Sequence, residues 1–147
     1  KDQGGGVYAQ STNAVVADCV IRDGKARYGG GVSGGIVTNC QITGNTGAER
    51  GGGTYNAEVV DSLLRYNGTG NGGSGAGAHS CRLLRCDLAN NIAYNGGGAY
   101  QSSLIQCRIR GNTATEDGGG AYACSLTGSQ VSGNEAGDDG ESLKAVG

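Results

Sequence analysis

The sequence contains no proline, methionine, tryptophan or phenylalanine among its 147 residues. Valine, isoleucine and leucine together occupy 24 positions, fewer than an ordinary globular core requires. Disorder would explain so few apolar residues, but the net charge is only -2 and the apolar residues recur at a fixed spacing. A repeat structure reconciles these observations, because each coil buries a few side chains and stacking makes the core continuous.

Charge and hydropathy exclude two further classes. A net charge of -2 and a pI near 5.3 give no basic patch of the kind that nucleic acid requires. The uncharged stretch Gly68–Ser80 is rich in glycine and serine, and such a polar segment does not insert into a membrane. The residues Lys1-Asp2-Gln3 lead directly into a repeat, so we expect any export leader to lie outside this sequence.

Glycine is the abundant residue, with 32 copies, and it marks a repeat. Glycine triplets begin at residues 4, 29, 51, 96 and 118, and a degenerate copy, Gly75-Ala76-Gly77, stands between the third and the fourth. This period predicts an all-β fold, a right-handed parallel β-helix (β-solenoid) of about six coils of about 22 residues. We expect a single domain over residues 1–147, with neighbouring coils about 4.8 Å apart.

When positions are counted from the first glycine of each coil, other residue types recur at the same position. We call each such set of equivalent residues a column. One column holds Cys19, Cys40, Ser62, Cys86, Cys107 and Ser129, provided that coil one carries an insertion near residues 10–13. An apolar column of Ile, Leu and Val lies two positions beyond it, so both columns share the inward face of a strand. A third column holds Asn45, Asn67, Asn91, Asn112 and Asn134.

The asparagine column is interpreted as a structural ladder. A buried side-chain amide can donate to the amide carbonyl of the asparagine in the next coil, so that each asparagine finds its hydrogen-bond partners within the column. Asparagine also tolerates the left-handed backbone conformation of a tight corner. The alternative is glycan attachment, but only Asn67-Gly68-Thr69 matches the acceptor sequence.

A nearly intact copy of the repeat runs from Cys107 to Tyr122. It reads Cys-x-Ile-x-x-Asn-x-Ala-x-x-x-Gly-Gly-Gly-x-Tyr. This pattern resembles the glycine-rich right-handed β-helix repeats of large bacterial surface and secreted proteins, including the polymorphic outer-membrane protein and autotransporter-passenger type. The resemblance covers residues 4 to 137 and implies the fold. It does not specify an activity, because pectate-lyase-like enzymes, adhesins and spacers share this architecture.

The six cysteines are interpreted chiefly as small packed thiols. In-register neighbours have parallel Cβ vectors, which suit the torsion of a disulfide poorly, and serine takes the same position in two coils. Cys81 and Cys124 share another column but stand two coils apart. Disulfides and a metal site remain as alternatives, although the Cys-x-x-Cys spacing of zinc sites is absent.

A mostly aromatic column follows each glycine triplet. It consists of Tyr8, Ser33, Tyr55, His79, Tyr100 and Tyr122. If the alternating small residues Val7, Val32, Thr54, Ala78, Ala99 and Ala121 face inward, the rings form an external stripe that could bind a ligand or partner. The alternative is an interior aromatic stack with the small residues outside.

The carboxylates give a weak case for catalysis. Polysaccharide lyases of this fold, as the resemblance implies, use clustered acids to hold calcium and a lysine or arginine as base. Asp18 and Asp61 share an outward column, and Arg22 and Arg65 another, but two coils separate the two acids. A further acidic group, Asp138, Asp139 and Glu141, is interpreted as a solvated end, with weak calcium binding as the alternative. We expect no cofactor.

The sequence therefore favours a non-catalytic structural or adhesive segment of an extracellular or cell-surface protein. Neither end of the chain looks like a solenoid cap, so we expect a piece of a longer solenoid or a subunit that stacks end to end into fibres. The expected partners are further coils or copies and, as a second class, glycans. The alternative function is a carbohydrate-binding or polysaccharide-degrading β-helix.

Overall fold

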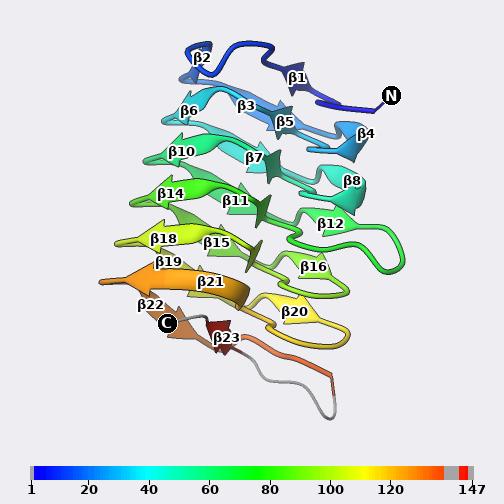
Figure 1. Cartoon of the computed structure of the whole chain (residues 1–147), viewed down its shortest axis with the longest axis vertical. Coiled ribbons are helices and arrows are strands. Elements are labelled where there is room, and N and C mark those ends of the chain that lie inside the picture. The colour runs from blue at the N-terminus through cyan, green and yellow to red at the C-terminus, as the bar shows by residue number, and fades with distance from the viewer. Residues whose placement is uncertain (1, 138–142, 146–147) are drawn as a thin grey trace.

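The fold is a parallel β-helix whose coils lie one beneath another along a single axis (Figure 1). The computed structural model describes residues 2–137 and 143–145. Within these residues every pair of adjacent strands is parallel, and the predicted all-β solenoid is confirmed. This part of the chain has no helix, and therefore none that is long and apolar enough to span a membrane.

Two stacks of short strands share one long strand. The first stack consists of β1 (Val7–Tyr8), β5 (Val32–Ser33), β9 (Thr54–Tyr55), β13 (Ala78–His79) and β17 (Ala99–Tyr100). The second stack consists of β2 (Val15–Ala17), β6 (Ile36–Thr38), β10 (Glu58–Val60), β14 (Arg82–Leu84) and β18 (Ser103–Ile105). Both stacks include β21 (Ala121–Thr127), which turns at Ala123 and joins them into one sheet. The strand β23 (Leu143–Ala145) pairs with β21.

Two further stacks complete the coil. The third stack consists of β3 (Val20–Arg22), β7 (Gln41–Thr43), β11 (Leu63–Arg65), β15 (Asp87–Ala89), β19 (Arg108–Arg110) and β22 (Gln130–Ser132). The fourth stack consists of β4 (Lys25–Tyr28), β8 (Thr46–Arg50), β12 (Gly68–Thr69), β16 (Ile92–Ala93) and β20 (Thr113–Ala114). In each coil the chain passes through the four stacks in order and then continues into the next coil.

The register confirms the columns read from the sequence. Val16 pairs with Val37 and Ile21 with Ile42, so the strands of coil one align with those of coil two. The extra residues of coil one lie between β1 and β2, around a turn closed by the bond from the Ala14 N–H to the Ser11 carbonyl.

The core is a set of columns with one side chain per coil. Its largest side chains are completely buried aliphatic residues of the second and third stacks: Val37, Val59, Leu83, Leu104, Ile42, Leu64, Leu88 and Ile109. The first stack contributes Val32, Thr54, Ala78, Ala99 and Ala121, which are also buried. A narrow interior filled by one layer of side chains explains how so few aliphatic residues suffice.

Left-handed residues form the corners of each coil. One column of them precedes the cysteine and serine column and has φ between 48° and 58°. Another precedes the asparagine column and has φ between 53° and 66°. The prediction that the asparagine itself adopts the left-handed conformation is wrong. The preceding residue makes the turn, and the asparagine that follows points inward.

The glycine triplets mark a third kind of corner, and each of the three positions requires glycine for a different reason. Gly96 has a φ of +63°, which disfavours a side chain. A Cβ on Gly97 would lie 2.4 Å from the Thr113 carbonyl oxygen and 2.5 Å from that of Gly119. A Cβ on Gly98 would lie 2.3 Å from the Gly120 carbonyl oxygen. The triplets therefore allow close backbone contact between coils.

We predict that Gly97→Ala lowers the free energy of unfolding by about 1–3 kcal/mol, because backbone atoms of the next coil must move to admit the methyl group. Urea denaturation followed by circular dichroism measures this change. The matched control is Gly68→Ala, because the nearest atom to a Cβ there is the Ile92 carbonyl oxygen at 3.8 Å. Equal destabilisation by both substitutions would contradict the explanation.

Candidate functional site

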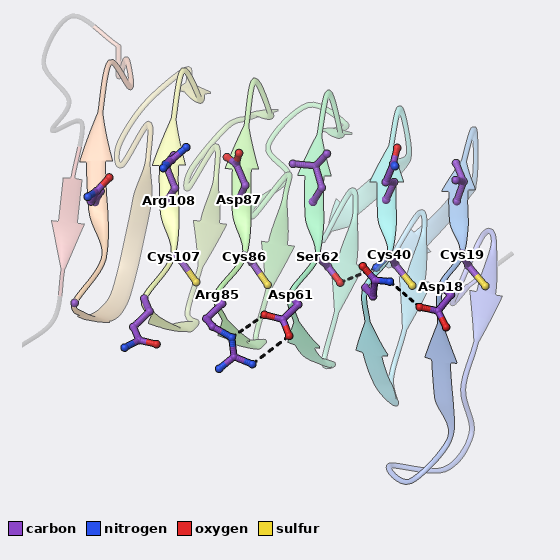
Figure 2. A pocket seen from close by; sticks show the side chains of 17 residues that line it. Asp18, Cys19, Cys40, Asp61, Ser62, Arg85, Cys86, Asp87, Cys107 and Arg108 are labelled. Carbon is purple, nitrogen blue, oxygen red and sulfur yellow. Dashed lines mark hydrogen bonds and ion pairs between the residues drawn. The ribbon is translucent and has the colours of Figure 1, made fainter.

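An open groove of about 780 Å³ runs along the helix axis where the second stack turns into the third (Figure 2). We call it the axial groove. One rim is a corner column: Asp18, Asn39, Asp61, Arg85 and Gln106. The other rim begins the third stack: Val20, Gln41, Leu63, Asp87, Arg108 and Gln130. The floor is the cysteine column: Cys19, Cys40, Ser62, Cys86 and Cys107.

The floor residues hold the corner together through hydrogen bonds. The backbone N–H of Cys40 donates to the Ser62 hydroxyl at 3.0 Å, and that hydroxyl donates to the Val60 carbonyl at 2.8 Å. Cys86 repeats half of this pattern, because its thiol donates to the Leu84 carbonyl at 3.4 Å. A small side chain with one donor and one acceptor therefore suits the position, which explains why both serine and cysteine occupy it.

All six cysteines are free thiols, and Cys19 alone is exposed. Burial raises the pKa of the Cys40 thiol. Cys86 and Cys107 stand in consecutive coils and interact through their side chains. The hydrogen bond between them raises the pKa of Cys86 and lowers that of Cys107.

The charged rim residues pair with one another from coil to coil. Asp61 accepts two hydrogen bonds from the Arg85 guanidinium, at 2.7 and 3.1 Å, and these bonds hold its pKa below the ordinary value. Asp18 accepts a bond from the Asn39 amide at 2.7 Å. Both members of the Asp61–Arg85 pair are about half exposed, so the pair contributes little stability.

The acid-and-arginine face considered for catalysis is not assembled. Asp18 and Asp61 bind different partners, Arg22 lies 3.9 Å from the exposed carboxylate of Asp23, and Arg65 lies 3.9 Å from Asp87. Among the described residues, no three His, Cys, Asp or Glu side chains gather where they could hold a metal ion. The acidic group Asp138, Asp139 and Glu141 lies outside the described residues.

Arg85 and Gln106 belong to the same rim as Asp18 and Asp61 but are not among the residues predicted from the sequence. Arg85 and Gln106 stand ten positions after their glycine starts, as Asp61 does, so extending the same column would have found them. The Asp87–Arg110 pair, with contacts of 2.9 and 3.2 Å, is different. It runs diagonally between columns, and column counting alone does not predict it.

The asparagine column forms a continuous hydrogen-bonded ladder in the next corner. The carbonyl oxygen of Asn91 accepts from both the backbone N–H and the side-chain amide of Asn67, each at 3.0 Å. The Asn91 amide in turn donates to the Leu64 carbonyl and to Asn112, each at 2.9 Å. Asn45, Asn112 and Asn134 continue the ladder in both directions. Asn67 is 1% exposed, so its acceptor sequence is inaccessible in the folded chain.

A column of stacked rings lies outside the first stack, on the face opposite its buried Val, Thr and Ala residues. Neighbouring ring centroids are 4.9 to 5.6 Å apart, a separation typical of favourable aromatic pairs. The rings belong to Tyr28, Tyr55, His79, Tyr100 and Tyr122. The tyrosine rings in the middle are partly exposed, and His79 is 3% exposed.

The top of the ring column differs from the predicted stripe. Tyr8 is half exposed and takes no part in the stack. Ser33, which occupies the aromatic position of coil two, is small and buried. Tyr28, from the end of β4, stacks on Tyr55 instead, and the guanidinium groups of Arg27 and Arg50 lie 5.2 and 5.7 Å from its ring centroid.

We predict that the fold loses stability as the pH falls from about 6.5 to 4, in part through His79. Burial and, secondarily, the positive charge of Arg50 lower the pKa of His79 to about 4. Because the folded-state pKa lies below the unfolded value, the stabilisation is complete above pH 6.5 and is lost as the ring is protonated. The loss amounts to roughly 2 to 3 kcal/mol.

The control is His79→Tyr, which restores the residue found at this position in coils three and five. Urea denaturation at pH 7 and pH 4 should show a smaller loss of stability for His79→Tyr than for the original chain. An identical loss in both proteins would show that His79 does not carry the effect.

The sequence was compared with models of protein families, with curated proteins and with solved structures, and none of the three comparisons gave a match.

Proposed function

We propose that this chain is a non-catalytic structural or adhesive segment of an extracellular or cell-surface protein. The most direct support is that many polar side chains of the interior and the rim are already paired with one another within the chain. Interior side chains are used in coil-to-coil ladders, and rim charges such as Asp61 and Arg85 neutralise each other. Such an arrangement produces a stiff rod with a regular surface.

The open edge of coil one supports assembly of the rod into longer structures. Within the described residues, β1, β2 and β3 each pair with one neighbour only, namely the strand of coil two. Val15 and Val20 in this coil are 62% and 63% exposed. An open strand edge with apolar side chains promotes pairing with another chain. A further coil, from a longer chain or a second copy, would pair with this open edge.

We predict that the isolated chain forms rods that lengthen with protein concentration, visible by negative-stain electron microscopy and by light scattering after size exclusion. Val20→Lys places a charge on the open edge and should shorten the rods. The matched control is Ile92→Lys, because Ile92 is similarly exposed, at 60%, but lies on a strand between two others. Monomers at every concentration, or equal shortening by both variants, would contradict end-to-end stacking.

Carbohydrate binding is the second candidate, and the axial groove favours it. Its rims present carboxylate, amide and guanidinium groups at every coil, and these groups hydrogen-bond well to sugar hydroxyls. Binding or cleavage of any member of a panel of acidic and neutral polysaccharides would favour this second function.

A further inference from the structure

The sequence contains three Asn-Gly steps, and the fold places them in different surroundings. They are Asn67-Gly68, Asn71-Gly72 and Asn95-Gly96. In such a step the backbone nitrogen of the glycine can attack the side-chain amide of the asparagine, because glycine has no Cβ that hinders the approach. In a folded chain the attack depends on whether both groups are free of other partners.

The first step is buried in the asparagine ladder. Asn67 is 1% exposed, and its side-chain amide donates to the Ile42 carbonyl at 2.9 Å and to the Asn91 side chain at 3.0 Å. The Gly68 N–H donates to the Asn45 carbonyl at 2.9 Å. Both reacting groups are therefore engaged, and they can meet only if this corner of the coil opens.

The third step is held by a single residue of the next coil. The side-chain carbonyl of Asn95 accepts a hydrogen bond from the Asp117 N–H at 3.0 Å. The Gly96 N–H donates to the Asp117 carbonyl, also at 3.0 Å. Asp117 thus binds both the side chain and the nitrogen that would have to react with each other.

The middle step lies in an exposed turn of the loop that follows β12 and projects from the rod (Figure 1). The Gly73 N–H closes this turn by donating to the Gly70 carbonyl at 2.9 Å. Among the contacts of the described residues, neither the Gly72 N–H nor the Asn71 side chain has a hydrogen bond. A Cβ on Gly72 would meet no atom within 4 Å, so the space around the reacting peptide is open.

We propose that Asn71 is a modification site, at which the folded chain deamidates spontaneously to aspartate and isoaspartate. The Gly72 nitrogen loses its proton to solvent and forms a bond to Cγ of Asn71, and the side-chain amide leaves as ammonia. The resulting five-membered imide takes up one water molecule. Opening at the side-chain carbonyl gives aspartate, and opening at the main-chain carbonyl gives isoaspartate. Water is the one co-reactant.

The modification changes the surface at one defined place. Each event adds a negative charge to a chain whose net charge is -2, and isoaspartate also adds a methylene group to the backbone of the turn. Asn71 lines a hollow of about 370 Å³ together with the exposed side chains of Ile92 and Tyr94. The residues that line this hollow carry no charge, so the new carboxylate becomes its charged group. The buried columns do not include this turn, and the modified chain should keep its fold.

Incubation of the folded chain at mildly alkaline pH, followed by proteolytic digestion and electron-transfer mass spectrometry, tests this proposal. Asn71 should convert at least about tenfold faster than Asn67 or Asn95, because the latter two must first lose several hydrogen bonds. Isoelectric focusing should show an acidic form that appears at the same rate. The same incubation in guanidinium chloride, which unfolds the chain, should bring the three steps to similar rates.

Two variants complete the test. Asn71→Ser should abolish the acidic form, and circular dichroism checks that the variant folds. The matched control is Asn13→Ser, because Asn13 also lies in an exposed turn but precedes an alanine, and it should leave the acidic form unchanged. Absence of conversion at Asn71, equal conversion of the three steps in the folded chain, or persistence of the acidic form in Asn71→Ser would overturn the proposal. The same preference for Asn71 in the unfolded chain would overturn the part assigned to the fold.

Discussion

The inward-facing backbone N–H groups at the corners are the constraint on which the fold depends. A left-handed residue turns the chain, and the next N–H donates to a side chain of the following coil instead of to a backbone carbonyl. Asn67 donates in this way to Asn91, and Cys40 to Ser62. An unsatisfied buried N–H costs about 1–3 kcal/mol, so each corner needs an acceptor in every coil. Because that acceptor belongs to the next coil, the bonds also fix the register.

The same constraint decides which residues the interior accepts. The acceptor must be small and must reach the N–H above it, and serine, cysteine and asparagine meet this requirement at different corners. Close contact between coils also leaves no space for a side chain at Gly97 and Gly98. The composition thus follows from the geometry of stacking.

The sequence alone predicts most of this fold, because one coil is aligned with the next and identical residues repeat. Counting from the glycine triplets predicts the columns of asparagine, cysteine and aliphatic residues. It does not predict the position of the Tyr28 ring, because Tyr28 precedes its triplet and stacks on Tyr55 from another strand. The pairing of Asp87 with Arg110 depends likewise on side-chain conformations, which cannot be predicted by counting positions within the repeat. The roles of the groove and of the ring column remain proposals.

Amide hydrogen exchange measured residue by residue by NMR tests the role of the corner hydrogen bonds most directly. The amides of Cys40, Asn67, Asn91 and Cys107 should exchange as slowly as those of the buried strand residues Leu64 and Leu88, because each donates to a side chain of the next coil. Exchange of these four amides as fast as that of Asn71, which lies in an exposed turn, would contradict this explanation of the fold.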